Sequence, residues 1–236
     1  MRGGRKLDFG FLSQYFNFFI DGAKITVILA IFTVMFGVLF GMILALMKLS
    51  NGNILSKILK FIASAYIEFI RGTPILVQLY IIYYGLPKIG IDFSGLSFLG
   101  DSVPDFMAGI ITLSINSSAY VAEIIRAGIQ AVDKGQMEAA RSLGMSKTMA
   151  MFHIIIPQAI KNILPALGNE FIVVIKESSI VSIIGIHELM YNADTVRGNT
   201  FQPFEPLIFA AVVYFAMTFL LSRVLGIAER RMKASD

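Results

Sequence analysis

Three ionisable residues, Glu170, Lys176 and Glu177, lie within one long apolar segment that runs from Phe152 to Ile186. A charged side chain at the centre of a bilayer costs at least about 2.5 to 3.5 kcal/mol on insertion scales, so such residues are functional by default. Glu170 and Glu177 are seven residues apart. On a helix they fall on nearly the same stripe, about 10 Å apart along the axis, whereas Lys176 lies well round from it.

Two carboxylates on one stripe of a membrane helix suit a ligand with separated cationic groups. The α-ammonium and the side-chain guanidinium of arginine are such a pair. We therefore expect Glu170 and Glu177 to face a polar cavity that binds a cationic amino acid. The alternative is structural, because the same charges can form ion pairs with neighbouring helices, for example through Arg71 or Arg223.

Other polar residues lie inside apolar runs as well. One polar turn consists of Asn116, Ser117 and Ser118. Ligand contact and helix packing explain these residues about equally well. Two acid and base pairs with helical spacing favour local salt bridges near the membrane surface. These pairs are Glu68 with Arg71, and Glu123 with Arg126.

The composition excludes an ordinary soluble domain. Of 236 residues, 56% are hydrophobic and only 15% are charged, and the mean hydropathy is +0.73. The chain has no cysteine, which excludes disulfides and thiolate metal sites, and its two histidines are too few for a histidine metal cluster. The net charge of +4 comes from basic residues that flank apolar runs. This pattern indicates an anionic membrane surface as the partner and argues against nucleic acid.

The apolar runs predict an all-α polytopic membrane protein with five transmembrane helices in one domain, residues 1–236. An α-helix of about 20 residues spans the hydrocarbon core of a bilayer. Lipid cannot satisfy polar groups, so the polar faces must point at other helices or at a water-filled path. We expect Gly72, Thr73 and Pro74 to break the second span. The predicted spans are Ile25–Met47, Phe61–Leu86, Phe106–Ile125, Phe152–Ile186 and Pro206–Ala228.

Basic residues gather in two connections and after the last span, and these segments should be cytoplasmic. They are Lys48, Lys57, Lys60, Lys134, Arg141, Lys147, Arg230, Arg231 and Lys233. The connections Lys88–Asp105 and His187–Glu205 carry fewer basic residues and should lie outside. Five spans then place the N-terminus outside and the C-terminus in the cytoplasm.

The N-terminal lead goes against this rule, since it carries Arg2, Arg5, Lys6 and Lys24. The other connections outweigh it. The aromatic stretch Phe9–Ile20 that follows is either an interfacial helix at the outer surface or an early start of the first span.

The connection at about 133–150 is amphipathic and too polar to enter lipid. Gln136–Leu143 consists of helix-forming residues, and Glu138 and Arg141 are spaced to support each other. Gly144 can adopt the left-handed conformation that ends a helix, and Ser146 can cap the next one. The expected helix offers an apolar edge to a partner protein. That edge consists of Met137, Ala140 and Leu143.

This connection resembles the EAA loop of ATP-binding-cassette (ABC) importer permeases, through Glu138, Ala139, Ala140, Gly144, Ile156 and Pro157. In that family the helix is the coupling element that fits a groove on the ATPase subunit. The resemblance implies that the contact with the ATPase is made by Glu138, Ala139, Ala140, Arg141, Leu143 and Gly144.

Three further stretches, Tyr66–Leu79, Asn116–Val132 and Pro157–Gly185, resemble permeases for polar amino acids. The resemblance is closest to arginine-type permeases that work as homodimers, and it implies a type I importer fold of five transmembrane helices per subunit. It also implies an extracellular amino-acid-binding protein, and a partner ATPase that holds ATP and magnesium while this chain holds no cofactor. The residues implied to line the substrate pocket are Glu170, Lys176, Glu177, Asn116 and Ser117. Arginine, lysine or histidine is the expected substrate, with glutamine or glutamate as the alternative.

Other functions fit the residues less well. The nearest string to a phosphate-binding loop, Gly144–Thr148, lacks the glycine spacing that cradles phosphates. The residues also suggest no serine, histidine and acid arrangement for hydrolysis, so we expect a transport subunit and not an enzyme. An ion-coupled secondary transporter would also place carboxylates in the bilayer. That class of transporter gives no reason for the amphipathic cytoplasmic helix, because it needs no partner protein to dock there.

Overall fold

The computed structural model describes residues 7–50, 52–91, 93 and 103–233, and all regular structure in these ranges is helical. The predicted all-α class is therefore confirmed. The elements are α1 (Leu12–Leu49), α2 (Ile54–Gly72), α3 (Ile75–Lys88), α4 (Val103–Gln130), α5 (Lys134–Ser142), α6 (Lys147–Ala150), a π-helical segment η2 (Met151–Ile155), α7 (Ile156–Glu177), a 3-10 helix η3 (Ser178–Ile184), α8 (Leu189–Thr200) and α9 (Glu205–Lys233). The basic residues Arg2, Arg5 and Lys6, and most of the connection between α3 and α4, lie outside the described residues.

Within the described residues, three helices are long and apolar enough to cross a membrane, namely α1, α4 and α9. The pair α2 and α3 meets the same test when taken together, but it is bent by 108°. The predicted break at Gly72, Thr73 and Pro74 is thus confirmed. Helix α7 carries Glu170 and Lys176 among its charges, and it does not qualify as a span by composition. The count of five spans stays a prediction.

The aromatic stretch near the N-terminus is the early start of α1, which runs without a break from Leu12 to Leu49. Phe19 in this part is fully buried against Leu189 and Ala193 of α8 and Ala210 of α9. The ring of Phe19 meets the ring of Phe209 edge-on, with centroids 4.8 Å apart. Burial of this apolar cluster holds the first turns of α1 between the last two helices.

Helices α1 and α4 pack closely because small residues line α1 where they meet. A methyl group added at Gly37 would lie 2.9 Å from the Ser117 hydroxyl, and one added at Gly41 would lie 2.7 Å from a methyl carbon of Val121. Ala45 continues the stripe and is fully buried. Small residues at four-residue spacing let two membrane helices approach until their backbones nearly touch.

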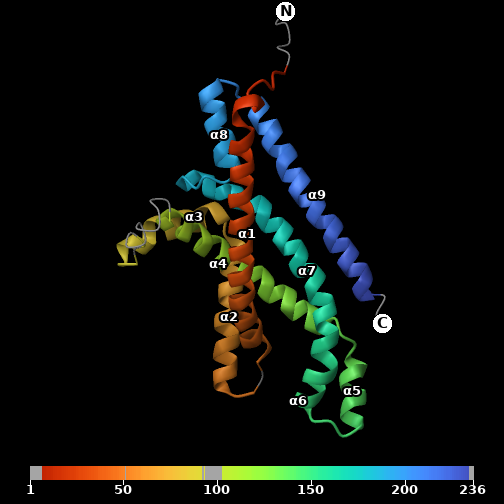
Figure 1. Ribbon diagram of the computed structural model, residues 1–236. Coiled ribbons are helices and arrows are strands. Elements are labelled where there is room, and N and C mark those ends of the chain that lie inside the picture. Colours follow the sequence, from red (N-terminus) through yellow and green to blue (C-terminus); the bar gives the residue numbers. More distant parts are fainter. Residues whose placement is uncertain (1–6, 51, 92, 94–102, 234–236) are drawn as a thin grey trace, which may run out of the picture.

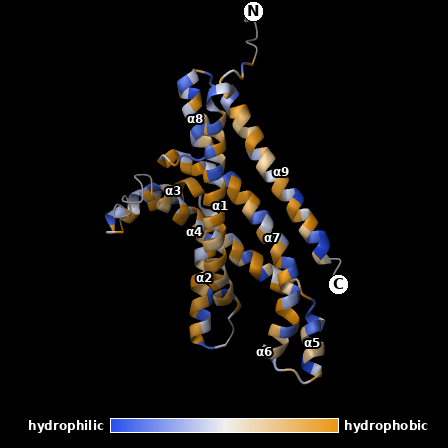
Figure 2. Ribbon diagram, in the orientation of Figure 1, coloured by the Kyte–Doolittle hydropathy of each residue, from blue (hydrophilic) through white to orange (hydrophobic). Residues whose placement is uncertain are grey.

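The two ends of the bundle differ in character (Figure 1). The start of α1, helix α8 and the start of α9 lie together at one end, and α5 with α6 lies at the other. Figure 2 shows apolar residues along α1 and α9, whereas hydrophilic residues concentrate on α5, on α8 and at the C-terminal end of α9. Large apolar side chains on the outside of α1, such as Ile31, Met35 and Leu39, are about half exposed. Such a surface fits lipid and not water.

Candidate functional site

The centre of the bundle holds a buried contact between α7 and α4. The Ser117 hydroxyl donates a 2.8 Å hydrogen bond to Oε1 of Glu170. Glu170 is 7% exposed and Ser117 is 2% exposed. Two residues that the resemblance implies for the pocket are thus in direct contact, although they are far apart in the sequence.

Among the described residues Glu170 has no ion-pair partner. The two arginines considered as partners lie over aromatic rings instead. The Arg71 guanidinium carbon is 5.3 Å from the centroid of the Tyr120 ring, and that of Arg223 is 4.9 Å from the centroid of Phe219. Neither of these arginines forms an ion pair with Glu170 among the described residues.

Asn116 faces a different neighbour. Its Nδ2 donates a 2.9 Å hydrogen bond to Oε1 of Gln78 in α3. Gln78 in turn donates to the Ile70 carbonyl at 2.8 Å and to the Thr73 carbonyl at 3.1 Å, where α2 ends. Asn116 therefore supports the corner between α2 and α3 and does not join the contact between Ser117 and Glu170.

The last residue of the polar turn, Ser118, packs helices together. Its hydroxyl is 2.9 Å from the Tyr66 hydroxyl, which also donates to the Ile115 carbonyl at 2.9 Å. Asn116, Ser117 and Ser118 thus point towards α3, α7 and α2, respectively. Only Ser117 reaches a carboxylate.

The other two charged residues lie at the end of α7. Lys176 is exposed and Glu177 is half-buried. Because α7 is one continuous helix from Ile156 to Glu177, the two glutamates keep the spacing of two turns expected from the sequence. Glu177 is near enough to act on Glu170 electrostatically.

The sequence analysis missed a second buried carboxylate. Glu188 is fully buried, and its Oε2 accepts a 2.6 Å hydrogen bond from the Tyr214 hydroxyl of α9 and a 3.5 Å bond from Thr26 of α1. Its other oxygen accepts from the Tyr191 backbone N–H at 2.8 Å, so Glu188 also caps α8. It lies in the connection His187–Glu205, which the sequence predicts to be outside the membrane. The sequence signal that could have indicated it is an acidic residue where a helix can begin, together with polar residues, Thr26 and Tyr214, inside the apolar runs of two other helices.

The amphipathic connection forms the expected helical hairpin. Asp133 caps α5 by accepting from the Gly135 N–H at 2.6 Å. Gly144 has a left-handed φ of 85°, and the Ser146 hydroxyl accepts from the Met149 N–H at 3.2 Å. The predicted stop at Gly144 and the cap at Ser146 are confirmed. The whole hairpin lies at the end of the bundle opposite α8 (Figure 1).

Two details of this hairpin differ from expectation. The proposed apolar edge is divided, because Ala140 is buried and Met137 packs inward, whereas Leu143 is 85% exposed. Arg141 does not pair with Glu138 among the described contacts. Its guanidinium donates instead to the Met145 carbonyl at 2.9 Å, because the left-handed turn brings that carbonyl within reach.

The two predicted local salt bridges have different outcomes. Arg126 pairs with Glu123 at 2.7 Å, as expected from their spacing. The pair of Glu68 and Arg71 is wrong within the described part of the chain, because Arg71 stacks on Tyr120 and Glu68 points to the surface.

Apolar helices around a buried carboxylate, a sharply broken span and an exposed helical hairpin at one end define a membrane permease subunit. Such a subunit forms the path for a solute and has no catalytic chemistry of its own. Residues 37–234 match the family described as "Binding-protein-dependent transport system inner membrane component", so the chain belongs to that family.

Relatives and solved structures agree with this assignment. The chain is 44% identical over 219 residues to a putative glutamine transport system permease protein of Rickettsia bellii, covering 92% of this chain and 94% of that protein. It is 38% identical over 230 residues to the arginine transport system permease protein ArtQ of Bacillus subtilis, covering 98% of this chain and 99% of that one. A chain from "Crystal structure of an amino acid ABC transporter with histidines" is 54% identical, with a TM-score of 0.86 over 96% of this chain and 99% of that chain.

The protein is thus a permease subunit of an ABC importer for amino acids, as the resemblance implied. It is a transport component, and ATP is hydrolysed by a separate partner chain. The reading as an ion-coupled secondary transporter does not hold. The importer-permease fold expected from the sequence is confirmed by the same comparisons.

Proposed function

We propose that this permease imports basic amino acids such as arginine, lysine or histidine by alternating access. The single observation behind this proposal is Glu170, a buried carboxylate that accepts a hydrogen bond from Ser117 and has no cationic partner among the described residues. A buried carboxylate without a counter-charge is unfavourable, and a ligand ammonium or guanidinium would supply that charge.

The substrate pocket in this proposal centres on Glu170, Ser117 and Glu177, and Lys176, which is exposed, and Asn116, which bonds Gln78, are its further candidate residues. Ser117 holds one oxygen of Glu170, which leaves the other oxygen for a cationic group. Glu177, two turns further along α7, is half-buried and can meet a second cationic group. Because Glu170 is 7% exposed, the pocket must open through a shift of α7 against α4. Such a shift belongs to the rigid-body movements by which transporters expose a site to each side in turn.

Names of similar proteins support the basic substrate. The solved transporter with 54% identity is described "with histidines", and one relative with 38% identity is named an arginine permease. Glutamine is the second candidate, because the Rickettsia relative with 44% identity carries a putative glutamine assignment. Uptake competition between the two classes of amino acid decides between them.

The helical hairpin is proposed as the coupling element. Leu143, at 85% exposure, would enter a groove on the partner ATPase, and Glu138, Ala139, Ala140, Arg141 and Gly144 would shape the contact. A second permease copy and an extracellular amino-acid-binding protein complete the proposed assembly, and the partner ATPase holds ATP and magnesium. The hairpin and the C-terminus would lie in the cytoplasm, with α8 and the N-terminus outside.

The test is reconstitution of the chain with its ATPase and binding protein in proteoliposomes. Uptake of radiolabelled arginine should require ATP, and excess lysine or histidine should compete better than glutamine or glutamate. Glu170→Gln and Glu177→Gln should both reduce arginine uptake. Wild-type affinity and rate in both variants would refute the proposed pocket. Better competition by glutamine than by lysine or histidine would identify glutamine as the substrate.

A further inference from the structure

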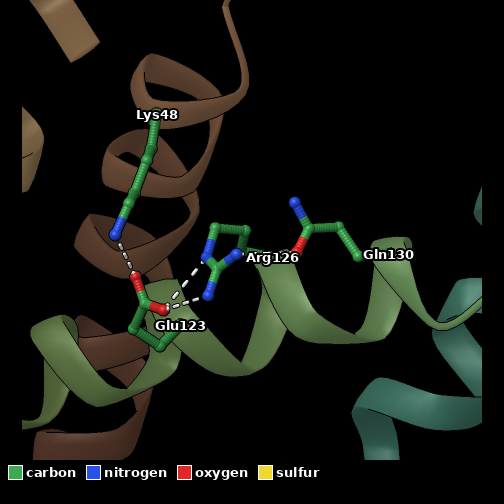
Figure 3. Close-up of polar contacts among 4 residues, drawn as sticks. All are labelled: Lys48, Glu123, Arg126 and Gln130. Carbon is green, nitrogen blue, oxygen red and sulfur yellow. Dashed lines mark hydrogen bonds and ion pairs between the residues drawn. The ribbon is translucent and has the colours of Figure 1, made fainter.

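A chain of polar contacts joins the end of α1 to the end of α4, away from the proposed pocket (Figure 3). Lys48 donates to Oε1 of Glu123 at 2.5 Å. Arg126 donates to the other oxygen of Glu123 through Nε at 3.0 Å and through Nη2 at 2.7 Å. Its Nη1 also donates to Oε1 of Gln130 at 2.6 Å. We call these four residues the α1–α4 polar network.

The network is more sheltered than an ordinary surface ion pair. The side chains of Lys48 and Glu123 are 20% and 18% exposed, whereas those of the pair Lys24 and Asp21, also on α1, are 65% and 64% exposed. Exposed pairs contribute little because water and salt screen them. Arg126 lies on α4 itself and orients the Glu123 carboxylate through two bonds to one oxygen, so the contact of Lys48 with the other oxygen is what joins α1 to α4 in this network.

The network lies midway between the proposed pocket and the proposed coupling hairpin. Glu123 is six residues after Ser117 and seven before Gln130 on the continuous helix α4, about 10 Å from each along the axis. Gln130 is the last residue of α4, and α5 begins at Lys134. A displacement of α5 therefore reaches the pocket through the part of α4 that carries Glu123.

Helix α5 has open space on the side that faces the end of α4. A cavity of about 450 Å³ is lined there by residues from α4, α5, η2 and the connection between α4 and α5, among them Gln130, Lys134, Met137 and Met151. The cavity leaves room beside α5, and Met137 anchors the helix to the buried cluster of Val132, Ile155 and Ala159. The end of α4 is held on two sides, by α7 near Gly128, where Ile163 and Asn162 contact it, and by α1 further back along the helix.

The attachment of α4 to α1 consists of the small-residue stripe and, at its end, the polar network. Gly37 and Gly41 contact α4 closely, Ala45 packs beside Ala122, and Lys48 then reaches Glu123. The small residues let the two helices approach closely, and the Glu123 carboxylate adds a charged contact between them at the end of α1.

We propose that Glu123 is a positioning residue for energy coupling. It holds α1 against α4, so that movement of the hairpin displaces these two helices together on the side of the pocket that carries Ser117. The inference rests on the proposed coupling role of α5. Without Glu123, part of the hairpin movement is absorbed between α1 and α4. ATP is then hydrolysed without a matching amount of transport.

The experiment compares Glu123→Gln, Lys48→Met and Lys48→Arg in the complete reconstituted assembly. The readout is the ratio of amino acid taken up to ATP hydrolysed. A coupling free energy in the usual range predicts that the ratio falls about fivefold or more in Glu123→Gln and Lys48→Met. Lys48→Arg keeps the charge and the donors, so its ratio should stay within about twofold of the wild-type value. Asp21→Asn, which breaks an exposed pair on α1, is the matched control and should leave the ratio unchanged.

The outcomes separate the possible explanations. An unchanged ratio in Glu123→Gln and Lys48→Met overturns the inference while the proposed function stands. The inference is also overturned if uptake and ATP hydrolysis fall in equal proportion and the unfolding temperature falls with them. That result would show a purely structural role for Glu123. If the wild-type assembly shows no ATP-driven uptake, the proposed function fails first, and the inference falls with it.

Discussion

The Ser117 hydroxyl donates a 2.8 Å hydrogen bond to the Glu170 carboxylate, and this bond joins α4 to α7 at the centre of the bundle. Ser117 also lies against Gly37, so one side chain contacts the walls formed by α1 and by α7. Any movement that separates α4 from α7 must stretch or break this bond. The contact is therefore a direct indicator of whether the proposed pocket is closed.

The first prediction concerns the charge of Glu170. Replacing it with Gln keeps the size and the bond to Ser117 but removes the attraction for a cationic substrate. A hydrogen bond to a charged group contributes about 1.5 to 3 kcal/mol, which corresponds to a loss of roughly 10-fold or more in apparent affinity. The measurement is the KM for arginine uptake beside the KM for glutamine uptake. An equal rise in the KM for arginine and for glutamine would show that Glu170 does not distinguish substrates by their charge.

The second prediction concerns the buried group at Glu188. Tyr214→Phe removes the 2.6 Å hydrogen bond to a fully buried carboxylate. An unsatisfied buried group costs about 1 to 3 kcal/mol, so the unfolding temperature in detergent should fall by several degrees. Tyr84→Phe is the control, because the Tyr84 side chain is 61% exposed. Equal unfolding temperatures for the two variants would show that the Glu188 contact is dispensable.

The third prediction concerns packing of α1 on α4. Gly41→Ala places a methyl group 2.7 Å from Val121, which forces the helices apart or bends a side chain. Overpacking of this kind destabilises by about 1 to 3 kcal/mol. Gly85→Ala in α3 meets nothing within 4 Å and should be neutral or slightly stabilising. Thermal unfolding of both variants measures the difference, and a stable Gly41→Ala protein would contradict the close approach of α1 and α4.

The fourth prediction concerns the turn at Gly144. Its φ of 85° is unfavourable for any residue with a β-carbon, so Gly144→Val should distort the hairpin at a cost of about 1 to 2 kcal/mol. The protein should still insert into the membrane, but ATP hydrolysis should no longer drive uptake. Gly90→Val carries comparable strain, at a φ of 81°, outside the hairpin and should keep coupling. Normal ATP-driven uptake in Gly144→Val would contradict the proposal that this turn shapes the contact with the ATPase.

Local signals predicted most of the architecture. The uncharged run of α1, the break at Thr73 and Pro74, and the hairpin stop at Gly144 each follow from chemistry within a few residues. The pairing of Glu123 with Arg126 also follows from helical spacing alone. Such features depend on neighbours in the chain, so one sequence is enough to find them.

Contacts between distant segments were harder to predict. No local pattern says that Ser117 rather than Asn116 meets Glu170, because the choice depends on how α4 is rotated against α7. The burial of Glu188 has no local signal, because its partners, Thr26 and Tyr214, are remote in the sequence. Leu143 is spaced as part of one apolar edge, but α5 ends at Ser142, and Leu143 at its C-cap is exposed whereas Ala140 is buried.

The corner between α2 and α3 has a consequence for solvation at the bend. A chain bent by 108° would normally leave backbone carbonyls in need of water. Here Gln78 donates to the Ile70 and Thr73 carbonyls, and the Thr73 hydroxyl donates to the Phe69 carbonyl at 2.9 Å. The elbow thus brings its own hydrogen-bond donors with it. The carbonyls of Phe69, Ile70 and Thr73 are therefore hydrogen-bonded at the bend without needing water.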